Sequence, residues 1–118
     1  MVVDDDRVTR TVVSTILGME EQYHVLEAEN GREALEIAHV ARPGLMILDV
    51  AMPELDGFGV CKAIREDPEL AAMQVLILSG RGDKRDRDLA RQMGADAYLT
   101  KPFTSVGLVE VVRQMAGE

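Results

Sequence analysis

The chain has 118 residues and a mass of 13.0 kDa, which fits a single domain over residues 1–118, and its 47% hydrophobic and 29% charged content is ordinary for a globular protein. The formal net charge of −8 disfavours direct binding to nucleic acid or to anionic membranes, and two Phe, two Tyr and no Trp provide no platform for stacking bases. One cysteine, no secretory signal and no long apolar run predict a cytoplasmic protein without a membrane anchor.

Short apolar runs alternate with helical patterns from one end of the chain to the other. The apolar runs predict strands over residues 1–4, 24–28, 45–49, 74–78 and 97–100. Apolar residues at helical spacing predict a helix after each strand, around residues 12–17, 34–38, 60–64, 83–93 and 108–115. This alternation is typical of an α/β fold, in which a parallel sheet is covered by helices on both faces.

Single residues refine these predicted elements. Asp6 is predicted to cap the first helix and Thr104 the fifth, because their side chains can accept a backbone N–H of the first turn. Val12 is predicted to belong to the apolar stripe of the first helix. Cys61 is interpreted as a buried structural residue, and the seven methionines as core residues.

Polar side chains stand at the ends of four predicted strands. Asp4 and Asp5 end the first strand, Asp49 the third, Ser79 the fourth and Lys101 the fifth. In an open parallel sheet, ligands bind beyond the carboxyl ends of the strands, where the strand order reverses. We therefore expect these five side chains to surround one crevice. Taken singly, each has an ordinary explanation as a helix cap, a turn residue or a surface charge.

The three strand-end aspartates predict a divalent cation. Crowded carboxylates repel one another, so they either share a proton or recruit a cation. Mg²⁺ takes oxygen ligands and keeps several waters, which fits Asp4 or Asp5 with Asp49 and a backbone carbonyl such as that of Ala51. Mn²⁺ accepts the same kinds of ligand.

The same residues could perform phosphoryl transfer. The carboxylate of Asp49 could attack a phosphorus atom and form an aspartyl phosphate. Charge on the phosphoryl oxygens could then be neutralised by the cation and by Lys101, while the hydroxyl of Ser79 donates a hydrogen bond.

Five blocks of the sequence resemble the response regulator receiver domain. They are residues 3–6 (VDDD), 48–53 (LDVAMP), 56–57 (DG), 79–80 (SG) and 94–103 (GADAYLTKPF), in order along a match that runs from Val2 to Met115. The resemblance implies a flavodoxin-like (βα)5 doubly wound sandwich, similar to a chemotaxis regulator, with a five-stranded parallel sheet in the order 2-1-3-4-5.

The resemblance also implies a role for each site residue. Asp49 would be the phosphoacceptor beside the Mg²⁺ pocket, and Lys101, in a cis peptide bond to Pro102, would contact the phosphoryl group. Ser79 would move toward that group and Tyr98 would follow inward. This movement would change the surface of the fourth helix, the fifth strand and the fifth helix.

Three features depart from the usual pattern of the family. Gly80 stands where alanine is more common, and Ala51 and Arg81 occupy the two positions that tune hydrolysis of the phosphoryl group. The first strand is short for a central strand, because only Val2 and Val3 lie between Met1 and the acids.

The function implied by the resemblance is a signalling switch rather than a metabolic enzyme. It would take a phosphoryl group from a histidine kinase or phosphotransfer protein, and it would catalyse only its own phosphorylation and dephosphorylation. Its phosphorylated state would then act on a protein target or an output domain. A phosphorylation-dependent dimer is also possible. The alternative is a phosphohydrolase of the haloacid dehalogenase type, although such enzymes need an aspartate where Ala51 stands.

The mixed charges of residues 84–88 indicate either a contact face or a solvated helix.

Overall fold

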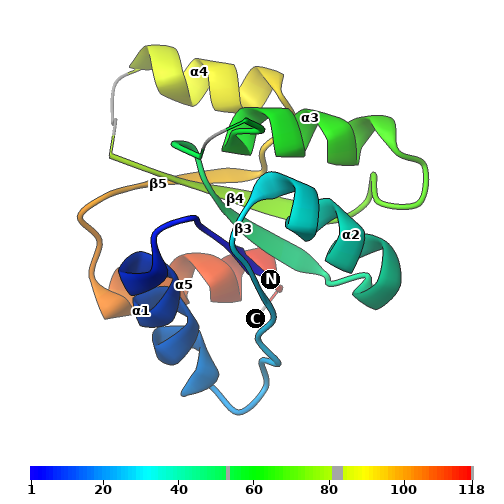
Figure 1. The fold of residues 1–118 in the computed structure, drawn as a ribbon. Coiled ribbons are helices and arrows are strands. Elements are labelled where there is room, and N and C mark those ends of the chain that lie inside the picture. Colours follow the sequence, from blue (N-terminus) through cyan, green and yellow to red (C-terminus); the bar gives the residue numbers. More distant parts are fainter. Residues whose placement is uncertain (53, 81–83, 118) are drawn as a thin grey trace.

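The computed structural model describes residues 1–52, 54–80 and 84–117, which form a sheet with helices on both faces (Figure 1). The strands are β1 Val2–Val3, β2 Glu27–Ala28, β3 Leu45–Asp49, β4 Gln74–Ser79 and β5 Ala97–Thr100. The helices are α1 Arg7–Gly18, α2 Gly31–Ala41, α3 Gly57–Glu66, α4 Lys84–Gln92 and α5 Ser105–Met115. Within the described residues, no helix is long and apolar enough to cross a membrane.

All neighbouring strands are parallel, and their order is β2-β1-β3-β4-β5, which confirms the predicted topology. The chain runs outward from β1 in one direction and then returns to place β3, β4 and β5 on its other side. The strand order therefore reverses between β1 and β3, at the carboxyl ends that carry Asp4 and Asp49.

The sheet separates two apolar clusters, one under each layer of helices. Helices α2, α3 and α4 cover one face, while α1 and α5 cover the other (Figure 1). Successive residues of a strand point to opposite faces, so Met46 and Leu48 pack toward α2 and α3, whereas Ile47 packs toward α1 and α5. Because both faces of β3 and β4 are covered, their sequences read as continuous apolar runs.

Among the residues that the structure describes, side-chain caps start four helices, and these include both caps that the sequence predicted. Asp6 accepts from the backbone N–H of Thr9, and Thr104 accepts from that of Gly107. Asn30 and Asp56 cap α2 and α3 in the same way. The predicted start of the fourth helix at Asp83 lies outside the described residues.

Some predicted details were wrong. Strand β2 begins at Glu27 rather than at residue 24, because it pairs only with β1 and β1 offers two residues for pairing. Val12 is 45% exposed, since the buried face of α1 is centred on Val13 and Leu17. The methionines are not all core residues, because Met19 is strongly exposed at the end of α1.

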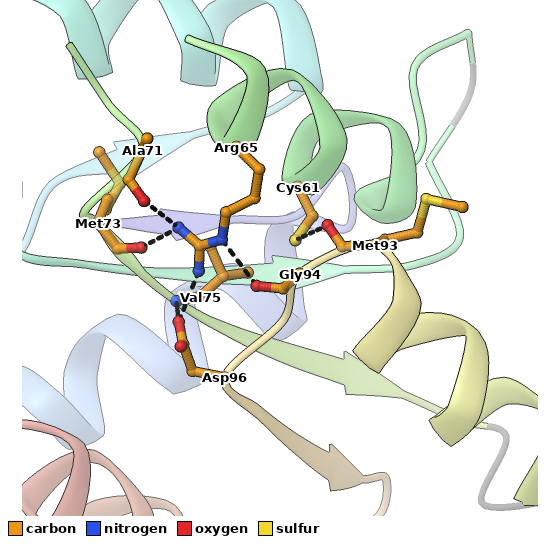
Figure 2. A network of polar contacts seen from close by, with 8 residues as sticks. All are labelled: Cys61, Arg65, Ala71, Met73, Val75, Met93, Gly94 and Asp96. Carbon is orange, nitrogen blue, oxygen red and sulfur yellow. Dashed lines mark hydrogen bonds and ion pairs between the residues drawn. The ribbon is translucent and has the colours of Figure 1, made fainter. Parts of the chain in front are cut away.

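A single arginine of α3 ties the far end of the sheet together. The Nε atom of Arg65 donates to the carbonyl of Gly94 at 2.8 Å, and its Nη1 atom donates to the carbonyls of Ala71 and Met73 (Figure 2). Gly94 has a φ of +98°, and a Cβ atom there would lie 2.6 Å from Cγ of Arg65. Glycine therefore allows the loop before β5 to lie directly on the arginine.

Asp96 completes this network. Its Oδ2 atom lies 2.7 Å from Nη2 of Arg65 and also accepts from the backbone N–H of Val75 at 2.8 Å (Figure 2). Beside it, the buried thiol of Cys61 donates to the carbonyl of Met93 at 3.2 Å. Helix α3, the start of β4 and the loop between α4 and β5 are thus held as one unit, and Cys61 is buried as predicted.

Replacing Arg65 by Met should destabilise the fold, because the apolar stem is kept while three carbonyls and Asp96 lose their donor. The variant loses hydrogen bonds made by a charged group and leaves partly buried acceptors without a donor. The free energy of unfolding, measured in urea, should therefore fall by about 2–4 kcal/mol. Lys62→Met is the matched control, since Lys62 is 64% exposed and pairs with Glu66 only at 3.9 Å. Equal losses in the two variants would contradict this role of Arg65.

Candidate functional site

Three carboxylates meet at the carboxyl ends of β1 and β3. Asp4 and Asp49 are 2% and 7% exposed, and Asp5 is exposed beside them. One ligand oxygen from each of the three lies within 4.8 Å of the others. The crevice predicted from strand ends therefore brings all three aspartates together.

Lys101 reaches into this acidic cluster from the end of β5. Its Nζ atom lies 3.0 Å from Oδ1 of Asp49 and 3.7 Å from Oδ2 of Asp4. The peptide bond between Lys101 and Pro102 is cis, as the resemblance implied. The backbone N–H of Lys101 also donates to the carbonyl of Ser79 at 2.7 Å, which fixes the end of β5 against the end of β4.

The carboxylate of Asp4 is held by a backbone N–H at the start of α1. The backbone N–H of Asp6 donates to Oδ1 of Asp4 at 2.8 Å, which fixes the carboxylate in the crevice. Burial raises the pKa of Asp4 to about 6, and the negative charge of Asp49 adds to this rise, while the hydrogen bond from Asp6 and the ammonium of Lys101 oppose it. Because burial and the charge of Asp49 disfavour ionised Asp4, a nearby cation would stabilise its carboxylate strongly.

Arg10 is a supporting residue that the sequence reading missed. Its Nη1 atom donates to the backbone carbonyl of Asp4 at 2.8 Å, and its Nε atom lies 3.3 Å from Oε1 of Glu27. Arg10 thus ties α1 to the ends of β1 and β2. The signal in the sequence was an arginine on the first helix, one turn after Asp6, but only the fold shows which carbonyl it contacts.

Gly57 has a steric role behind the Asp49 backbone. Its N–H donates to the carbonyl of Val50 at 3.2 Å, and a Cβ atom at Gly57 would collide with the carbonyl oxygen of Asp49. Asp56 caps α3, so the Asp56-Gly57 pair both starts the helix and allows it to begin against the end of β3. In the sequence, residues 56–57 stand out only as part of the family resemblance, and this close approach appears only in the fold.

The remaining predicted residues lie around the same edge at different depths. Ser79 is buried at the end of β4, whereas Ala51 is exposed, two residues beyond Asp49. Tyr98 is half-buried on the face of β5 that packs against α3 and α4, so its side chain lies on that face of the sheet rather than in the acidic cluster. Arg81, which belongs to the departures noted in the sequence, lies outside the described residues, as does Pro53.

The donor set suits a hard divalent cation. Carboxylate oxygens are the ligands that Mg²⁺ and Mn²⁺ prefer, and both ions take one or two protein carboxylates while keeping waters for an incoming oxygen ligand. Asp4, Asp5 and Asp49 could hold such an ion, because their oxygens already converge. The arrangement combines a cluster that could hold a metal with an ammonium beside one of its carboxylates.

Known proteins are similar to this chain in both sequence and fold. The family profile of the response regulator receiver domain matches residues 1–113. The probable transcriptional regulator ycf27 of Guillardia theta is 39% identical over 113 residues, which make up 96% of this chain and 43% of that protein. The chain therefore spans less than half the length of this relative.

Solved structures give the same result. The chemotaxis protein CheY4 of Vibrio cholerae matches with a TM-score of 0.90 and 32% identity, over 97% of this chain and 94% of that chain. The signal receiver domain of a histidine kinase from Syntrophus aciditrophicus matches with a TM-score of 0.88 and 34% identity, over 98% of this chain and 87% of that chain. These matches leave the haloacid dehalogenase alternative without support, and the chain belongs to the response regulator receiver domains of two-component signalling.

Proposed function

We propose that Asp49 accepts a phosphoryl group and that the chain works as a phosphorylation-dependent switch. The observation that carries this proposal is the ammonium of Lys101, 3.0 Å from a carboxylate oxygen of Asp49 that itself belongs to the acidic cluster. One acid thus has both a metal-binding neighbourhood and a fixed cation beside it. A purely structural ion pair would not need two further aspartates at the same point.

In the proposed reaction, a carboxylate oxygen of Asp49 attacks the phosphorus of a phosphohistidine, so a P–O bond forms while the P–N bond to the donor breaks. Lys101 then neutralises charge on the phosphoryl oxygens, and the hydroxyl of Ser79 donates to one of them. Asp4, Asp5, Asp49 and the backbone carbonyl of Ala51 would hold Mg²⁺, or Mn²⁺ in its place. When bound, this ion neutralises further charge on the phosphoryl group. Dephosphorylation of Asp49 would be the only other reaction of the chain.

The switch would pass its state to the surface through Ser79 and Tyr98. Ser79 would move toward the phosphoryl group and Tyr98 would turn inward, which changes the surface of α4, β5 and α5. A receiver domain generally works between a histidine kinase and an output target. For this chain the donor would be a histidine kinase or phosphotransfer protein, and the readout a protein partner, an output domain or a phosphorylation-dependent dimer.

Residues 1–118 would act as a single receiver domain in the cytoplasm. Their net charge of −8 supports signalling through protein contacts rather than through direct contact of this domain with nucleic acid or a membrane. The longer Guillardia theta relative is named a transcriptional regulator, which supports an output at the level of transcription.

Incubation with Mg²⁺ and acetyl phosphate should add one phosphoryl group, detected by intact mass, because a small acyl phosphate can replace the protein donor. Asp49→Asn should abolish the adduct, since the amide cannot form the acyl phosphate. Asp56→Asn is the matched control, because Asp56 caps α3 outside the acidic cluster and Asn is also a good cap. An adduct that survives Asp49→Asn, or a wild-type protein that forms none with Mg²⁺ bound, would rule out the assignment of Asp49.

Replacing Asp4 and Asp5 by Asn should weaken Mg²⁺ binding, measured by isothermal titration calorimetry. Mutation of residues that only hydrogen-bond the metal ligands typically lowers metal affinity about 10- to 100-fold. Loss of two carboxylate ligands should therefore lower the Mg²⁺ affinity at least about tenfold. Asp6→Asn is the control, because Asp6 caps α1 instead of joining the cluster. Unchanged affinity in the double variant would contradict the proposed pocket.

Burial of Asp4 should make the stability of the metal-free protein depend on pH. The pKa of Asp4 is about 6 in the folded protein, and an aspartate in an unfolded chain has a pKa of about 4. The folded state therefore holds this proton more tightly, so the contribution of Asp4 to stability is fully present below about pH 4 and is lost as pH rises through about 6. The full difference is on the order of 2–3 kcal/mol.

In the presence of a chelator, the wild-type protein should gain about 1 kcal/mol from Asp4 when pH falls from about 7 to about 5. Urea unfolding of the wild type and of Asp4→Asn at both pH values isolates this contribution, because the amide does not titrate. Mg²⁺ added at pH 7 should stabilise the wild type, since it binds only the folded state. The same pH dependence in both proteins would show that Asp4 does not carry it.

A further inference from the structure

Helix α4, strand β5 and the loop between them line a shallow hollow. It has a volume of about 260 Å³, and its lining includes Arg87, Arg91, Asp96 and Tyr98. The hollow lies beside the half-buried ring of Tyr98, and Arg87 is an exposed residue of α4 at its rim. A long cation therefore stands next to the aromatic residue that would carry the switch.

Arg87 makes two contacts with β5. Its guanidinium carbon lies 5.8 Å from the centroid of the Tyr98 ring, within the range of a cation–π interaction. Its Nη2 atom donates to Oγ1 of Thr100 at 3.4 Å. Residues two apart in a strand share one face, so one arginine of α4 bridges two neighbouring side chains of β5.

Thr100, the second contact of Arg87, lies beside residues of the proposed phosphorylation site. Thr100 is paired in register with Ser79, while Tyr98 is paired with Ile77. The residue after Thr100 is Lys101, whose ammonium contacts Asp49. Arg87 thus contacts both Tyr98 and the end of β5, where Thr100 pairs with Ser79 and precedes Lys101.

We propose that Arg87 is a positioning residue that holds Tyr98 in the arrangement of the unphosphorylated protein and thereby opposes phosphorylation of Asp49. This inference rests on the proposed function and adds a residue of α4 that sets the balance of the switch. Arg87 is exposed on α4 and Tyr98 is half-buried, so an inward turn of Tyr98 would take its ring away from the guanidinium and lose this contact. A contact made in one state only must shift the equilibrium toward that state.

Coupling between two sites is reciprocal. If phosphorylation of Asp49 displaces Tyr98, then releasing Tyr98 must favour phosphorylation by the same factor at equilibrium. An exposed cation–π contact corresponds to a factor of about two to five. Loss of the Arg87 charge should therefore raise the phosphorylated fraction at limiting acetyl phosphate by about this factor.

Three variants separate the contact from a general effect of surface charge. Arg87→Met keeps the stem but removes the charge, and Arg87→Lys keeps a cation that can still lie over the ring. Arg85→Met removes the same charge from another exposed position of α4 and serves as the control. The chain has two tyrosines and no tryptophan, so ring signals of ¹³C-labelled tyrosine come from Tyr98 and Tyr23 alone, with Tyr98→Phe to assign them.

In the unphosphorylated protein, we expect Arg87→Met to shift the ring signals of Tyr98 and leave those of Tyr23 unchanged. Arg87→Lys should lie close to the wild type, and Arg85→Met should match it. Intact mass at limiting acetyl phosphate should then show about two- to fivefold more phosphorylated protein for Arg87→Met only.

Two results would overturn the proposal: Tyr98 signals that Arg87→Met leaves in place, or shifted signals with no change in the phosphorylated fraction. A wild-type protein without any adduct is a different result, because it rejects Asp49 as the phosphoacceptor and the coupling with it, while the Tyr98 signals still report whether Arg87 holds the ring.

Discussion

Two buried carboxylates, Asp4 and Asp49, share one ammonium, and the rest of the site depends on this imbalance of charge. Asp4, Asp5 and Asp49 carry three negative charges when ionised, and Lys101 supplies one positive charge. The cluster is therefore left with a formal charge of −2 in a place where burial already raises the pKa of Asp4 to about 6. A divalent cation would balance this charge, and a phosphoryl group on Asp49 would bring new negative charge to the cation and Lys101 together.

The fold holds these charges at one point and leaves one side of the sheet able to respond. Gly57 lets α3 begin directly against the backbone of Asp49, and Arg65 fixes the opposite end of the same helix to the loop before β5. Helix α4 has only Ala90 fully buried, and Arg87 is a long exposed contact between it and β5. The acidic cluster thus lies beside a helix that contacts the end of β3 at one end and the loop before β5 at the other, while α4, the helix that would report its state, buries Ala90 and contacts β5 through Arg87.

The sequence predicted most of this fold because its strongest signals are local. Residues 45–49 and 97–100 were bounded correctly, since apolar runs mark buried strands, and the strand-end rule grouped Asp4, Asp49 and Lys101. Strand β2 was predicted too long, because its length follows from pairing with β1 rather than from its own residues. The contacts of Arg65 and Asp96 join residues 31 positions apart, which no local pattern reveals.

The central claim is that the three aspartates at the ends of β1 and β3 form one metal site around Asp49. The most direct measurement is anomalous diffraction from crystals grown with Mn²⁺, an ion that takes the same oxygen ligands as Mg²⁺. The predicted result is one ion bound by carboxylate oxygens of this cluster, with the ammonium of Lys101 still beside Asp49. An ion bound elsewhere, or an empty cluster at a saturating Mn²⁺ concentration, would contradict the claim.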